Sequence, residues 1–281
     1  MQMSTIIRVA VMIIGAVIAF IGMNKQKEGA TWGQPVAILG AVIAIIAALW
    51  GIVRNVSGAD YSAARDRELE YQRIQTRHLG EYLASKFAGS KALVIKDTML
   101  YYNFDGSEIA NPLDTQLEGL KQGIGSAITI VNEVCPPLPK LERRVEKGPN
   151  GEEMPMDELI PPMEMWFKPA DLDKLLKSAG DYDMIIALVS FPMGSFGSKS
   201  PAKATLEKKK VVLIGGDSSV YGYLFKQGIA VAAVTHNPNA VYDDEPIPSD
   251  KQKAFDKRYL MLTAENYESV MKANAQMFNI K

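Results

Sequence analysis

Two long runs of hydrophobic residues dominate the start of the chain, at residues 5–23 and 36–53. Each run approaches the roughly 20 apolar residues that a helix needs to cross a bilayer. Arg8 is the only charged residue in either run, and it lies near an end, where its side chain can reach the headgroups. Because only twelve residues separate the runs, we expect a two-helix transmembrane hairpin over residues 1–54. The alternatives are a cleaved signal peptide for the first run and a buried soluble helix for the second.

Both runs repeat nearly the same phrase, GAVIAFIG and then GAVIAIIA. Small residues let membrane helices approach closely, so we expect the hairpin to pack through Gly15, Gly22, Gly40 and Gly51. Basic residues near membrane spans favour the cytoplasm. The amino end offers Arg8 and the α-amine, the turn offers Lys25 and Lys27, and the stretch after the second run offers Arg54, Arg65, Arg67 and Arg73. This balance predicts a multi-pass protein of the cell (inner) membrane with its soluble domain in the cytoplasm, and the periplasm is the alternative.

A proline-free, mixed-charge stretch follows the hairpin and predicts a stalk helix over residues 55–88. Leu79, Leu83 and Phe87 recur on one helical face, and Gly89 is a typical stop signal. The helix is expected to dock on a domain formed by residues 89–281.

In that domain, short apolar runs alternate with amphipathic helices. The predicted strands are residues 91–97, 127–134, 183–191, 210–217 and 229–238, and the predicted helices are residues 111–125, 168–180, 218–228 and 263–278. Runs such as DMIIALVSF are apolar on both faces, as in the middle of a parallel sheet. The pattern therefore predicts an α/β fold with a single doubly wound, five-stranded, mainly parallel sheet.

One insertion, at residues 136–165, interrupts the alternation with dense proline and mixed charge. The PNG sequence at 149–151 can form a tight turn between LERRVEK and EEMPMDE, which predicts an exposed β-arm. The arm is either a solvated surface loop or a contact for a partner or a second copy of the chain.

The order of these pieces resembles the carboxy-terminal lobe of the class I periplasmic sugar-binding proteins. The resemblance covers about residues 80–275 and rests on KALVIKD, QLEGLKQGIG with SAITIV, DYDMIIALVSFP, KKVVLIGGDSSVYGYLFKQGIAVAAVTHNP and RYLMLTAENYESV. It implies a periplasmic-binding-protein-like lobe. Two such lobes close around a sugar in that family, whereas this chain has the residues for a single lobe. Relatives of this kind work outside the cytoplasm, although the same lobe also occurs in cytoplasmic sugar-responsive regulators.

Ligands of open α/β sheets lie beyond the carboxyl ends of the strands. The candidate ligand-binding residues at those ends are Asp97, Asn103, Asp105, Ser190, Phe191, Asp217, Ser218, His236 and Asn237. The resemblance implies a polar ligand contact at Asp217. A helix cap is the alternative for Asp217, a structural role for His236, and a turn for Asn237-Pro238. The Gly/Ser loop at 190–201 is either a lid or a long connection.

Composition narrows the chemistry further. A net charge of −1 without a basic cluster argues against nucleic acid. Two histidines far apart and the single Cys135 supply no metal-ligand spacing, and no acid–base pair or cofactor motif is present. We therefore expect no metal, no cofactor and no catalysis. The expected function is a structural or protein-interaction component of a membrane complex, with the lipid bilayer and self-association or other subunits as partners. The alternative is a membrane-tethered binding module for a small, sugar-like ligand.

Overall fold

The computed structural model describes residues 3–56, 59–103, 107–109, 114–139, 145–147, 153–155, 161–216 and 218–278. Asp105, Asp217 and most of the 140–160 segment lie outside the described residues. The chain divides into two compact units. Residues Met1–Glu68 with Tyr242–Pro246 form the first, and residues Leu69–Val241 with Ile247–Lys281 form the second.

The first unit contains two apolar helices, α1 (Met3–Lys27) and α2 (Gly33–Val56), packed antiparallel through small residues. A Cβ atom added at Gly22 would lie 2.3 Å from the backbone nitrogen of Ala37, and one at Gly40 would lie 2.3 Å from that of Ala19. Gly15 makes a similar approach to Ala44. The expected glycine contact is confirmed at these three positions, and for Gly51 it stays a prediction.

Large apolar side chains of α1 and α2 point away from this small-residue contact. The exposed ones include Ile13, Ile14, Val17, Phe20, Ile38, Leu39, Ile45 and Ile46. Within the described residues, α1 is long and apolar enough to cross a membrane over Val9–Lys27, while the apolar part of α2, Gly33–Leu49, is shorter. α1 therefore has the length and the apolar composition that a membrane-spanning helix needs, while the crossing itself and a second span stay predictions.

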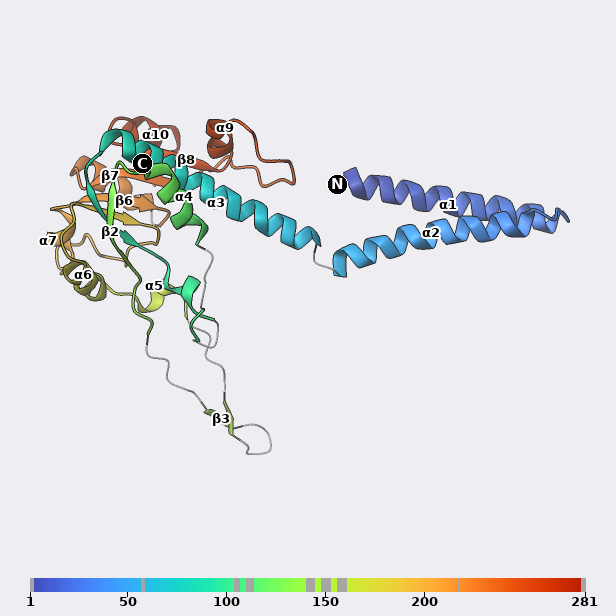
Figure 1. Cartoon of the computed structure of the whole chain (residues 1–281), viewed down its shortest axis with the longest axis horizontal. Coiled ribbons are helices and arrows are strands. Elements are labelled where there is room, and N and C mark those ends of the chain that lie inside the picture. Colours follow the sequence, from blue (N-terminus) through green and yellow to red (C-terminus); the bar gives the residue numbers. More distant parts are fainter. Residues whose placement is uncertain are drawn as a thin grey trace. The chain divides into compact units, whose positions relative to one another are not determined.

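The second unit is built on a six-stranded sheet (Figure 1). Its strands are β1 (Lys91–Ile95), β2 (Thr129–Val134), β5 (Met184–Ala187), β6 (Lys210–Ile214), β7 (Ala230–His236) and β8 (Tyr259–Thr263), in the spatial order β2-β1-β5-β6-β7-β8. The first five in that order are parallel, and β8 runs antiparallel to β7. All five predicted strands are present. The prediction has five strands and the sheet has six. The additional strand is β8, which lies just before the helix expected over 263–278 and overlaps its first residue.

Helices cover both faces of this sheet. Along β1, Ala92 and Val94 join one apolar cluster while Leu93 and Ile95 join the other, as the alternation of a strand requires. The first cluster is completed by α3 (Ala59–Lys86), α4 (Thr115–Ile124) and α9 (Lys251–Asp256), and the second by α6 (Pro169–Ser178), α7 (Lys203–Leu206), α8 (Tyr221–Lys226) and α10 (Tyr267–Ala273). The sheet is therefore wound on both sides, as predicted.

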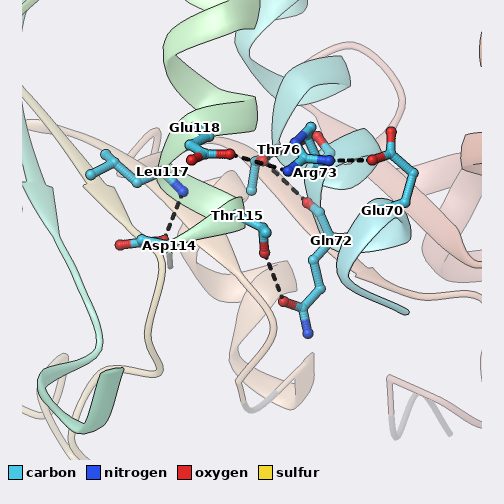
Figure 2. Close-up of polar contacts among 8 residues, drawn as sticks. All are labelled: Glu70, Gln72, Arg73, Thr76, Asp114, Thr115, Leu117 and Glu118. Carbon is cyan, nitrogen blue, oxygen red and sulfur yellow. Dashed lines mark hydrogen bonds and ion pairs between the residues drawn. The ribbon is translucent and has the colours of Figure 1, made fainter. Parts of the chain in front are cut away.

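Helix α3 is part of this core from Leu69 onward, where it packs against α4. The two helices meet through glycines: a Cβ atom at Gly119 would lie 2.3 Å from the carbonyl oxygen of Arg73, and one at Gly123 would lie 2.2 Å from that of Arg77. Polar bonds surround the contact (Figure 2), including the ion pair of Arg73 with Glu118 at 3.1 Å. The predicted stalk is therefore an integral helix of the α/β core over its second half.

Helix boundaries differ from the predicted ones in two places. Asp114 caps α4 by accepting a hydrogen bond from the Leu117 backbone at 2.9 Å, so the cap is Asp114 and not the start of the predicted 111–125 segment. The segment after β6 begins as a 3-10 turn, η2 (Ser218–Val220), before α8.

The strands of the predicted arm pair as a separate two-stranded sheet, β3 (Val145–Lys147) with β4 (Glu153–Pro155). Lys147 lies opposite Glu153, and the turn predicted at 149–151 lies outside the described residues. The antiparallel arm is confirmed for these residues. Two further short elements are η1 (Thr98–Tyr101) and α5 (Met163–Trp166).

Candidate functional site

A cavity of about 640 Å³ opens at the carboxyl ends of β5 and β6. We call it the edge cavity. Its walls come from the residues after β5, the turn after β6, the start of α8, and α5. They include Glu164, Ser190, Phe191, Pro192, Met193, Phe196, Gly215, Gly216, Ser219, Val220, Tyr221 and Tyr223. Ligands of open α/β sheets bind beyond this edge, so the cavity lies where the fold predicts a ligand.

The turn after β6 shapes one wall. Gly215 and Gly216 have φ angles of 67° and 85°, which side chains with a Cβ atom rarely adopt. A Cβ atom at Gly216 would also lie 3.3 Å from the Oγ atom of Ser190, so the turn is pressed against the end of β5. The Tyr221 hydroxyl donates a hydrogen bond to the Gly215 carbonyl and ties the turn to α8.

The loop after β5 forms the opposite wall through a series of bonded turns. The buried Ser195 hydroxyl donates to the Pro192 carbonyl at 2.6 Å, and the Gly197 backbone donates to the Gly194 carbonyl at 2.9 Å. The rings of Phe191 and Phe196 lie 5.7 Å apart. These bonds favour a preformed wall, whereas the Gly/Ser composition predicts either a lid or a long connection.

The lining is apolar and aromatic, with little charge. Glu164 is the one charged side chain among the described lining residues, and it is exposed at the rim. No described lysine or arginine lines the cavity. Glu164 makes no ion pair within the described part of the chain.

The C-terminal segment supports the wall from behind. The Ser218 hydroxyl donates to the Met277 carbonyl at 3.0 Å, and the buried Phe278 ring lies 6.3 Å from the ring of Tyr221. Ser218, a predicted ligand contact, therefore binds the backbone of the chain itself.

A separate polar cluster occupies the carboxyl ends of β1 and β2. Glu133 accepts bonds from Lys96 at 3.0 Å and Lys121 at 2.6 Å, and the Lys96 ammonium lies 4.5 Å from the centre of the Tyr101 ring. Burial lowers the pKa of Lys96, but its bonds to Tyr101 and Glu133 outweigh that and raise the pKa to about 12. Lys96 is thus a permanent cation whose role is to hold the two strand ends together.

Cys135 follows this cluster and is half-buried. Burial raises the pKa of its thiol, which keeps the sulfur protonated and poorly nucleophilic. Within the described residues, no three His, Cys, Asp or Glu side chains lie close enough to hold a metal ion.

The other predicted residues take local roles. Asp97 caps η1 through the Met99 backbone at 2.8 Å, and the Asn103 amide donates to the Ser107 hydroxyl at 2.9 Å. His236 lies 5.7 Å from the Tyr259 ring, and the Asn237 amide donates to the Asp256 carbonyl at 2.7 Å. Of the nine predicted residues, Ser190 and Phe191 line the edge cavity, and Asp105 and Asp217 lie outside the described residues.

A smaller cavity, of about 300 Å³, lies between α3 and residues 247–254. His78 is among its lining residues and stacks on Phe255 with ring centres 4.2 Å apart. Arg77 and Lys251 of its lining both pair with Glu81, so these charged groups are committed to one another, and the larger edge cavity is the stronger candidate.

No protein-family model matches the chain, and no curated protein sequence is significantly similar to it. The geometry of the chain therefore carries the functional argument alone.

Proposed function

We propose that this protein is a membrane-anchored binding domain that holds a small molecule in the edge cavity. The single observation behind the proposal is the cavity itself, because about 640 Å³ is within the range of small-molecule sites. A flat or self-covered strand edge would have argued for a contact domain that has lost its pocket.

The membrane part of the proposal is a two-helix anchor formed by α1 and α2. In its support, the two helices bury glycines against one another and turn their large apolar side chains outward. This arrangement suits lipid as the surrounding solvent. A cytoplasmic position of the binding domain follows the charge balance and stays part of the proposal.

Ligand-observed NMR of the full chain in a non-ionic detergent, screened with a fragment library, tests the binding function. Ser190→Trp fills the edge cavity, and the exposed Ser85→Trp on α3 is the matched control. We expect fragments that bind the wild type and the control to be lost from Ser190→Trp. Fragment binding that is the same in all three proteins would refute the edge cavity as the site.

Cell fractionation tests the anchor. The full chain is expected in the membrane fraction, where alkaline carbonate does not extract it, and a chain lacking residues 1–54 is expected to leave that fraction. A reporter fused after Lys281 then assigns the side of the membrane.

A second candidate function is assembly of a membrane complex through the arm. The observation that favours it is that, within the described residues, β3 and β4 form a two-stranded sheet of their own, since an isolated two-stranded hairpin is marginally stable in water and gains from a partner. Deleting residues 140–160 would then abolish oligomers, whereas unchanged oligomer size would argue against this function.

A further inference from the structure

The lining of the edge cavity restricts the chemistry of its ligand. Four aromatic residues contribute to the walls, namely Phe191, Phe196, Tyr221 and Tyr223. Aromatic faces carry partial negative charge and attract cations, most strongly where water is excluded. Tyr221 is almost fully buried, while Tyr223 and Glu164 lie at the exposed rim.

Charge at the cavity has one sign. Glu164 places a carboxylate at the rim, no described lysine or arginine offsets it, and no ion pair within the described residues uses it. An anionic ligand would enter this site without a partner for its charge, which is costly. A cation could form an ion pair with the Glu164 carboxylate and lie against the faces of the aromatic rings.

Five hydroxyl side chains line the cavity, namely those of Ser190, Ser195, Ser219, Tyr221 and Tyr223. The Ser195 hydroxyl is committed to the Pro192 carbonyl, and the Tyr221 hydroxyl to the Gly215 carbonyl. Apolar side chains outnumber these hydroxyls in the lining, so a sugar, which needs a partner for each of several hydroxyls, is the less well matched ligand. A ligand with a flat or branched apolar body is well matched.

We propose that the edge cavity binds an organic cation, such as a substituted ammonium ion, whose apolar or aromatic body lies among the rings of Phe191, Phe196, Tyr221 and Tyr223. This inference rests on the proposed binding function and names the ligand class of the same site. Glu164 faces the positive group at the rim and selects for it.

Isothermal titration calorimetry of the full chain in a non-ionic detergent tests the proposal with three soluble probes that share a phenyl ring. These are benzyltrimethylammonium, benzyl alcohol and phenylacetate. We expect the cation to bind about tenfold more tightly than the alcohol, and phenylacetate to bind most weakly. Glu164→Gln should weaken the cation several-fold and leave the alcohol unchanged.

Two further variants separate charge from folding. Glu207→Gln removes another exposed carboxylate, which pairs with Lys203 and does not line the cavity, so it should leave all three affinities unchanged. Phe196→Leu keeps an apolar wall but removes a ring, and should weaken the cation more than the alcohol.

The outcomes also separate this inference from the proposed function. Equal or weaker binding of the cation than of benzyl alcohol or phenylacetate would overturn the ligand class while leaving a binding site in place. Cation binding that survives Glu164→Gln undiminished would overturn the role of Glu164. If none of the three probes binds, this inference fails, and the fragment screen with Ser190→Trp decides the proposed function separately.

Discussion

Gly119→Ala offers the sharpest test of how α3 is joined to the α/β core. The added Cβ atom would lie 2.3 Å from both the Arg73 carbonyl oxygen and the Thr76 hydroxyl oxygen. An ordinary contact needs about 1 Å more, so α4 must move away from α3 by about that distance. The Arg73 carbonyl belongs to the helix backbone and cannot turn aside, as a flexible side chain would.

The expected cost combines two opposing effects. Overpacking of this kind destabilises a core by about 1–3 kcal/mol. Alanine in place of a helical glycine returns about 1 kcal/mol. Because the obstruction is backbone and the gap opens along the whole α3–α4 contact, we expect a net loss of about 2 kcal/mol, or a urea midpoint lower by about 1 M.

The effect is measured by urea unfolding of the full chain in a fixed concentration of non-ionic detergent, with near-ultraviolet circular dichroism as the signal. Gly222→Ala in α8 is the matched control, because its Cβ atom would meet only the flexible end of Met271, at 3.0 Å. We expect this control to stay within about 1 kcal/mol of the wild type. A Gly119→Ala protein as stable as the control would refute the close approach of α3 and α4.

Three further predictions concern other parts of the second unit. Glu133→Gln leaves the buried Lys96 without its carboxylate partner and should lower the unfolding free energy by about 2–3 kcal/mol in the same urea assay. Lys121→Met removes the exposed partner of Glu133 and should lower it by less than about 1 kcal/mol. Burial lowers the pKa of His78 below its ordinary value of 6.5, so the unfolded chain binds a proton at this side chain more readily than the folded chain does. The stability that His78 contributes is therefore complete above pH 6.5 and is lost as the pH falls below that value. His78→Phe should therefore lose less stability than the wild type between pH 7.5 and 5.5, and equal losses would argue against a buried His78. Phe278→Ala should lower the free energy of unfolding by about 3 kcal/mol, measured by urea unfolding, and loosen the cavity wall at Tyr221, measured by hydrogen exchange of α8. Unchanged exchange in α8 would show that the Phe278 ring does not support the wall.

The buried strands were predictable because their sequences have no polar face. Val211 to Ile214 and Met184 to Ala187 are apolar at every position, as strands covered on both sides require. β8 is not among the predicted strands because Thr263 resembles a helix cap, and the pattern places the start of the helix expected over 263–278 at this residue. In the structure Asn266 precedes α10, and its side chain accepts a hydrogen bond from the Thr263 backbone.

The edge cavity was only partly predictable. The rule that ligands lie at the carboxyl ends of strands pointed to Ser190 and Phe191, since both lie at the end of the strand predicted over residues 183–191. Tyr221 and Tyr223 were not identified, because an aromatic residue in a short helix is indistinguishable from core. Glu164 comes from the proline-rich insertion, far from β6 in sequence, and no periodicity relates the two. The fold can be predicted from local patterns that repeat along the chain, whereas this site depends on tertiary contacts between segments that are distant in sequence.

The crossover from β2 to β5 has an evolutionary consequence. It carries the arm and then α5, where Glu164 reaches the rim of the edge cavity. The entropy of closing a loop grows only with the logarithm of its length, so even a twofold change in this connection alters stability by about 0.6 kcal/mol. Insertions and deletions can therefore accumulate in the connection between β2 and β5 while both strands stay paired with β1. Homologous chains would be free to change the charge at the cavity rim, and with it the ligand, without rebuilding the sheet.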